Sequence, residues 1–184
     1  MDQQELEEIL RRISEGKRER DKKLDLFDFR GMDLPRADLS GVSAEKTHFE
    51  GAGLNSVNFS GAQLARAFFK GAKLKSADLS VVEASGADFS GADLRGANLR
   101  QANFAEADFT GADLEKADLR GAVLTGADFT GANFKKAKLE GIELLGGELD
   151  GALNVTERWP GHLFHPALKT RHEARRQQKR GGRK

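Results

Sequence analysis

The chain has 184 residues and no cysteine, and its 30 Lys and Arg nearly balance its 29 Asp and Glu. The lack of cysteine excludes disulfide bonds and thiolate metal sites. No apolar run is long enough to span a membrane and no secretory signal is visible, so we expect a cytoplasmic protein with one domain and two short flanks.

Residues 1–23 predict an amphipathic helix. Their apolar positions recur at helical spacing within a highly charged segment: Leu6, Ile9, Leu10 and Ile13. We interpret this stripe as a cap on the first coil of the repeat that follows, because the ends of solenoids need polar-faced caps. A partner-binding helix is the alternative, and capping is favoured.

Residues 24–153 contain a repeat with a period of five. Between Phe29 and Leu149 there are 25 centre positions, of which fourteen are Leu, nine are Phe and two are Ala. Two residues before the next centre lies a small residue, which is Ala in 18 of the 25 positions from Met32 to Ala152. Inward positions therefore alternate between gaps of two and three residues. A gap of two is strand-like, and a gap of three requires a corner, where Gly is well tolerated.

This pattern predicts an all-β solenoid with the apolar lattice inside. Its core ladder is indicated by phenylalanines 20 residues apart: Phe29, Phe49, Phe69, Phe89, Phe109 and Phe129. Twenty residues per coil means four sides of five residues, and about six coils. The six rings should then stack at about 4.8 Å, the spacing of neighbouring strands.

The repeat resembles the pentapeptide-repeat family, whose consensus is close to Ala-(Asp/Asn)-Leu-X-X. The clearest stretch is residues 86–100, which read Gly-Ala-Asp-Phe-Ser, Gly-Ala-Asp-Leu-Arg and Gly-Ala-Asn-Leu-Arg. The resemblance covers about residues 27–153 and implies a right-handed quadrilateral β-helix.

Residues 154–168 could cover the last coil or form a homodimer interface. The candidate residues for either role are Trp159, Leu163 and Phe164. In family members of known role, the C-terminal segment often mediates dimers. The sequence leaves both interpretations open.

Residues 169–184 form a basic, flexible tail in our interpretation. Its candidate contact residues are Lys169, Arg171, Arg175, Arg176, Lys179 and Arg180. Residues 154–184 have a net charge of +7, whereas residues 24–153 have a net charge of −6. The tail could contact nucleic acid non-specifically, bind an acidic protein or serve only as a solvated end. It lacks the interleaved aromatic residues that bind single strands by stacking.

The residue before each centre is often Asp or Asn and should point outward. On coils of 20 residues, one possible acidic contact stripe is formed by Asp88, Asp108, Asp128 and Glu148. The stripe could imitate DNA phosphates, but the family consensus alone accounts for it, because Asp and Asn satisfy backbone groups near corners. A second surface, with lysines from Lys73 to Lys136 among Asp and Glu, is interpreted as a solvated mixed-charge face.

We find no catalytic constellation, no phosphate-binding loop and no cofactor motif. His162 and His165 have a spacing that a metal site could use, but no third ligand is evident and Pro166 follows directly. A column of exposed Asp offers no apolar pocket that would raise a pKa for acid–base catalysis. We therefore expect a protein that is not an enzyme.

The sequence favours a non-enzymatic scaffold that binds another protein. The resemblance supplies an alternative, because some pentapeptide-repeat proteins mimic B-form DNA and protect DNA gyrase or topoisomerase IV. The basic tail, the moderate acidity of the repeat and its unbroken register from residue 29 to 152 depart from that type. Nucleic-acid binding through the tail is a third possibility.

Overall fold

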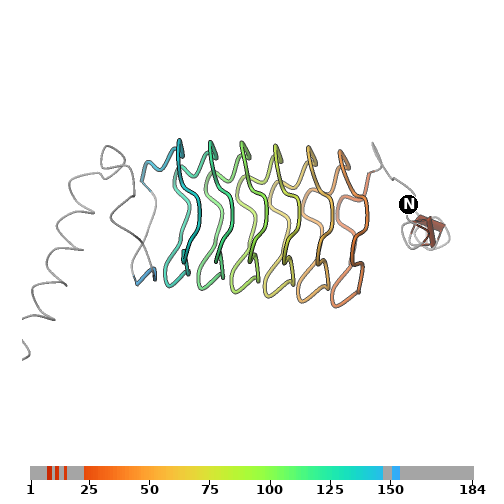
Figure 1. Cartoon of the computed structure of the whole chain (residues 1–184). Coiled ribbons are helices and arrows are strands. Elements are labelled where there is room, and N and C mark those ends of the chain that lie inside the picture. The colour runs from red at the N-terminus through yellow and green to blue at the C-terminus, as the bar shows by residue number, and fades with distance from the viewer. Residues whose placement is uncertain (1–7, 10, 13–14, 16–22, 147–150, 154–184) are drawn as a thin grey trace, which may run out of the picture.

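The structure, a computed structural model, describes residues 8–9, 11–12, 15, 23–146 and 151–153. The repeat winds into a rod of stacked coils (Figure 1). Each side of a coil pairs with the coils before and after it through isolated parallel bridges between residues 20 apart, beginning with Lys23↔Ser43. Within the described residues there are no longer strands, and residues 8–9 and 11–12 have helical conformation. The period of 20 residues is therefore the length of one coil.

Four flat faces follow from this period, and we number them by their inward centre residues. Face 1 has the centres 29, 49, 69, 89, 109 and 129, and face 2 has 34, 54, 74, 94, 114 and 134. Face 3 has 39, 59, 79, 99, 119 and 139, and face 4 has 24, 44, 64, 84, 104, 124 and 144. Successive faces meet at corners, so faces 1 and 3 lie on opposite sides of the rod.

Each corner is a tight turn whose second central residue has a left-handed backbone. At the first complete corner, the Met32 amide donates to the Phe29 carbonyl at 3.1 Å, and Gly31 between them has φ 65°. This is the geometry of a type II turn. All six described corners between faces 1 and 2 at residues 31–131 are Gly, with φ from 64° to 71°. The corner after face 3 instead includes Val81 at φ 57°, a conformation that β-branched residues rarely adopt.

The interior is filled by the apolar lattice. All six phenylalanines of face 1 are completely buried, and their rings stack nearly parallel with centroid separations of 4.8 to 5.1 Å. Rings from other faces meet this stack edge-on, as Phe104 does against Phe89 and Phe109 at 5.7 and 5.3 Å. The ring column lies where the 20-residue spacing placed it, and it fixes the register of every coil.

The ends of the chain are described only in part. Ile9 from the predicted capping helix is 2% exposed and belongs to the core cluster. The remaining apolar positions of that stripe, at residues 6, 10 and 13, lie outside the described residues, so capping by the whole helix stays a prediction. The proposed cap or dimer segment 154–168 and the basic tail 169–184 also lie outside them. No helix in the described part of the chain is long and apolar enough to cross a membrane.

Candidate interaction surfaces

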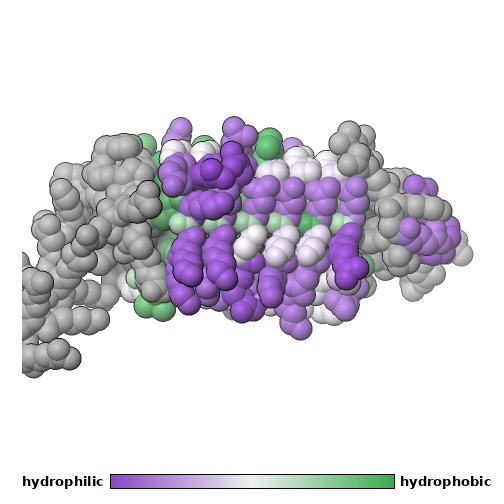
Figure 2. Space-filling view, in the orientation of Figure 1, coloured by the Kyte–Doolittle hydropathy of each residue, from purple (hydrophilic) through white to green (hydrophobic). Residues whose placement is uncertain are grey.

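The outward side chains of the rod form straight columns, because bridged residues 20 apart lie directly above one another. The predicted acidic stripe is such a column on face 1, since Asp88 is bridged to Asp108 and Asp108 to Asp128. Its fourth predicted member, Glu148, lies outside the described residues. Most side chains visible on the surface in Figure 2 are hydrophilic.

Each Asp of this stripe satisfies a backbone group at the following corner. Asp88 accepts a hydrogen bond from the Ser90 amide at 2.8 Å, and Asp108 accepts one from the Thr110 amide at 2.7 Å. Asp128 is bound in the same way by the Thr130 amide. The repeat therefore has a structural use for these residues. Their carboxylates nevertheless make no ion pair within the described part of the chain.

The N-terminal half of face 1 has a different surface. The His48 imidazole stacks on the Phe68 ring with a centroid separation of 4.7 Å and an angle of 14°, and its Nδ1 lies 2.9 Å from Glu50 Oε1. Arg30 binds Asp28 through two charge-assisted hydrogen bonds of 2.8 and 2.5 Å. These bonds hold the pKa of Asp28 well below its usual value.

Three exposed cations next to this cluster were not singled out by the sequence analysis. They are Lys46, Arg66 and Lys70, and none makes an ion pair with a described residue. A signal for Arg66 and Lys70 exists in the sequence, because no Asp or Glu occurs between Glu50 and Asp78. Lys46 lies outside that interval and directly follows Glu45, so the sequence gives no such signal for it.

The carboxylates in the outward column of face 3 are contacted by amides or by cations. Asn58 donates to Asp38 at 3.2 Å across one coil, and Asn98 donates to Asp78 at 3.0 Å across another. Further along the column, three cations converge on one carboxylate: the side chains of Arg100, Arg120 and Lys138 lie 3.6, 2.6 and 3.6 Å from Asp118.

Asp118 has the clearest electrostatic perturbation on this face. The Arg120 guanidinium donates to both of its oxygens, at 2.8 and 2.6 Å. Hydrogen bonding to Arg120 lowers the pKa of Asp118 to about 2, although partial burial opposes the shift. The same Asp-X-Arg pairing occurs on face 1 at Asp28 and on face 2 at Asp93. In Asp93, hydrogen bonding to Arg95 lowers the pKa of the carboxyl.

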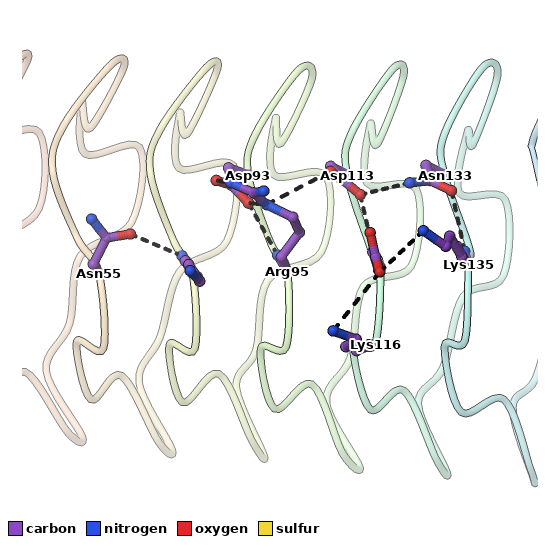
Figure 3. Close-up of polar contacts among 9 residues, drawn as sticks. Asn55, Asp93, Arg95, Asp113, Lys116, Asn133 and Lys135 are labelled. Atoms are coloured by element: carbon purple, nitrogen blue, oxygen red, sulfur yellow. Dashed lines mark hydrogen bonds and ion pairs between the residues drawn. The ribbon is translucent and has the colours of Figure 1, made fainter.

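Face 2 is a mixed-charge network (Figure 3). Arg95 binds Asp93 at 2.5 Å and reaches Asp113 on the next coil at 3.7 Å. Glu115 lies between Lys116 and Lys135, at 3.9 and 3.5 Å. These contacts join successive coils, so most of the charge on this part of face 2 is satisfied within the chain.

The described part of the chain contains no group of three or more His, Cys, Asp or Glu that could hold a metal ion. His162 and His165 lie outside the described residues, as do Trp159, Leu163, Phe164 and the six basic residues predicted as tail contacts.

The repeat geometry agrees with a comparison against protein-family models. The model described as "Pentapeptide repeats (8 copies)" matches residues 52–91, 85–121 and 107–144, which together span half of the chain. The chain belongs to the pentapeptide-repeat family. Members of this family form right-handed quadrilateral β-helices, as the resemblance implied. A comparison with curated proteins found no match.

Several solved structures are similar to the chain. HetL of the cyanobacterium Nostoc sp. strain PCC 7120, involved in the regulation of heterocyst differentiation, is 27% identical over 80% of this chain and 93% of its own, with a TM-score of 0.34. A pentapeptide-repeat protein of the Arabidopsis thaliana thylakoid lumen is 36% identical over 59% and 66% of the two chains, with a TM-score of 0.31. Trypsin-treated QnrB1, a plasmid-mediated fluoroquinolone resistance protein, is 24% identical over 71% and 69%, with a TM-score of 0.37.

Proposed function

We propose that this protein is a non-enzymatic scaffold that binds another protein on a flat face of its rod. The observation that carries the proposal is the continuous ladder of bridges along all four faces, which holds outward side chains at fixed, regular spacings. A preorganised surface loses little conformational freedom when it binds a partner. Pentapeptide-repeat proteins are generally structural or interaction proteins rather than enzymes, which also supports the proposal.

The test is capture of a partner by the full-length chain and by four variants, each altered on one face. Each variant replaces two exposed charged residues by Ser: Lys70 and Glu106 for face 1 and its edge, Lys73 and Lys75 for face 2, Arg100 and Lys138 for face 3, and Glu83 and Glu143 for face 4. We expect one variant to lose a partner that the other three retain. Retention by all four would contradict the proposal.

A second candidate function is modulation of DNA gyrase or topoisomerase IV by a DNA-like acidic surface. One feature favours it: Asp88, Asp108 and Asp128 present three carboxylates in a row on face 1, and none of them makes an ion pair with a described residue. Opposing it, many acids on faces 2 and 3 are paired with Arg or Lys, so these two faces offer few free carboxylates.

A gyrase supercoiling assay separates these functions. Its two proteins are the full-length chain and a full-length variant in which the basic residues of the tail are changed to Gln, namely Lys169, Arg171, Arg175, Arg176, Lys179 and Arg180. Inhibition by both would favour the acidic-surface function. Inhibition by the unaltered chain alone, falling steeply with salt, would indicate that the tail binds DNA. The scaffold proposal expects no inhibition by either.

A further inference from the structure

Face 1, with its edge toward face 4, has unpaired cations in its N-terminal half and only acids in its C-terminal half. In the N-terminal half, Arg30 is paired with Asp28, and the His48 imidazole contacts Glu50, a contact that is an ion pair only when His48 is protonated. The cations left on this half and its edge with face 4 are Lys46, Arg66 and Lys70, and one exposed acid at that edge, Glu45, likewise makes no ion pair with a described residue. In the C-terminal half, the residues left over are acids: Asp88, Glu106, Asp108 and Asp128. Such unpaired charge contrasts with the paired charges of faces 2 and 3.

At the other edge of face 1, the left-handed position of each corner carries no side chain. Every corner from Gly31 to Gly131 on this edge is glycine, whereas the corners between faces 2 and 3 include Arg36, Lys116 and Lys136 at the same left-handed backbone position. A Cβ built on Gly51 would meet no atom within 4 Å, so interior packing does not require glycine there. Glycine at this position leaves each corner on that side with one side chain instead of two, so a flat partner can approach it more closely.

These charges are complementary to a second copy of the same face. A two-fold axis that lies between two rods and runs across them reverses the direction of one rod and keeps each column opposite its equivalent. The N-terminal half of one copy then faces the C-terminal half of the other. Parallel rods would instead place Asp88, Asp108 and Asp128 against the same three residues of the partner.

The register that pairs opposite charges is centred between the coils of Phe69 and Phe89. In the edge column, Lys46 and Glu106 lie equally far from this centre, so Lys46 of each copy faces Glu106 of the other. In the neighbouring column, His48 and Phe68 face Asp108 and Asp88, with Arg66 and Lys70 beside Phe68. At the ends of this column, Asp128 faces Asp28, whose charge is neutralised by Arg30. Each contact occurs twice by symmetry.

We propose that face 1 is a self-association surface on which a second copy of the chain packs antiparallel, with Lys46 of each copy paired to Glu106 of the other. This proposal is independent of the scaffold function and of the predicted C-terminal dimer segment. About six coils at ~4.8 Å spacing give a contact roughly 30 Å long and one side wide. That area is below the ~800 Å² per partner of a standard interface, so the association is weak and depends on salt.

Sedimentation equilibrium of the full-length chain over a wide concentration range tests the proposal. At low salt, the weight-average mass should rise from 20.1 kDa toward twice that value, and about 0.5 M salt should reverse the rise. Lys46→Glu and Glu106→Lys should each weaken association at least about tenfold, because like charges then face each other twice. The matched control is Lys136→Glu, the same charge change at another exposed corner with left-handed backbone, and it should leave association unchanged. Circular dichroism confirms that each variant is folded.

Mixing the two single variants is the decisive step. Lys46→Glu and Glu106→Lys should associate with each other to within about threefold of the unaltered chain, because both contacts in the mixed dimer again join opposite charges. If Glu106→Lys weakens association and Lys46→Glu does not, an acidic surface binds another basic segment, such as residues 169–184, and the proposal is wrong. Association that neither variant changes, or no association at low salt, also overturns it.

Discussion

Faces 1 and 3 lie on opposite sides of the rod. Each has an outward column that contains aspartates, but the carboxylates of the two columns have opposite surroundings. On face 3, Asn58 and Asn98 separate the carboxylates and donate to them, and three cations surround Asp118. On face 1, Asp88, Asp108 and Asp128 follow one another without an amide or a cation between them. Like charges in adjacent positions of a sheet are destabilising, so face 1 is less well satisfied within the monomer than face 3.

The difference shows that the repeat fixes where a side chain points and leaves its chemistry free. Asp118 and Asp88 occupy equivalent positions of the five-residue unit and both accept a hydrogen bond from the amide two residues on. They differ in that residue, which is Arg120 after Asp118 and Ser90 after Asp88. The residue two positions on thus supplies one neutralising cation for Asp118, and neighbouring coils supply two more, Arg100 and Lys138.

The largest expected effect comes from a substitution in the buried interior between the two faces. Phe89→Asp places an unpaired charge in the middle of the buried ring column, and we expect it to abolish cooperative folding, at a cost well above ~4 kcal/mol. The matched control is Phe68→Asp, the same change on the outside of face 1, where Asp is the usual residue. It should cost less than about 1 kcal/mol, through loss of the His48 stacking. Thermal unfolding followed by circular dichroism measures both, and a Phe89→Asp variant that melts like the parent would contradict the four-sided register.

The sequence predicts the interior well because inward and outward positions alternate locally. The 20-residue spacing of Phe29 to Phe129 was enough to place the rings in one column, and the stacked rings lie there. The five-residue period also placed Asp88, Asp108 and Asp128 in one outward column. Both inferences need only the period and the length of a coil.

The pairing of charges could not be predicted in the same way, because it depends on contacts between coils. Lys135 reaches Glu115, 20 residues earlier, and Lys138 reaches Asp118 in the same manner. Whether a long side chain leans toward the coil before or after it is decided by its rotamer. Only the Asp-X-Arg pairs are local enough to be recognised in the sequence, as in Asp28 and Arg30.

The second prediction compares the two carboxylates directly. Asp118→Asn keeps an oxygen for the Arg120 amide and removes the charge that three cations share, so we expect a loss of about 1 kcal/mol at neutral pH, allowing for solvent screening. Asp88→Asn makes the same change where no described cation is present and removes repulsion with Asp108, so it should be neutral or slightly stabilising. Urea unfolding of the two variants and the parent measures the difference, and equal effects would show that the face 3 pairs add nothing to stability.

The pH dependence of this difference has a defined sign. The pKa of Asp118 is lowered to about 2 in the folded protein, whereas an unfolded Asp titrates near 3.9. Its contribution is therefore complete above about pH 4 and is lost as the pH falls from about 4 to about 2. The stability gap between the parent and Asp118→Asn should close over this interval, and a constant gap would assign the effect to packing.

The smallest expected effect concerns the edges of the two faces. The corner after face 1 is glycine in every described coil, whereas the corner after face 3 holds Val81 at φ 57°. A β-branched residue is strained there. Val81 is 58% exposed, so burial of its side chain contributes little stabilisation to offset this strain. Val81→Gly should stabilise the protein by roughly 0.5–1 kcal/mol, because relief of strain exceeds the greater entropy of glycine in the unfolded chain. The converse change in the same column, Gly61→Val, should destabilise it by a similar amount. If chemical unfolding shows both changes to be destabilising, the Val81 side chain contributes contacts that outweigh its backbone strain.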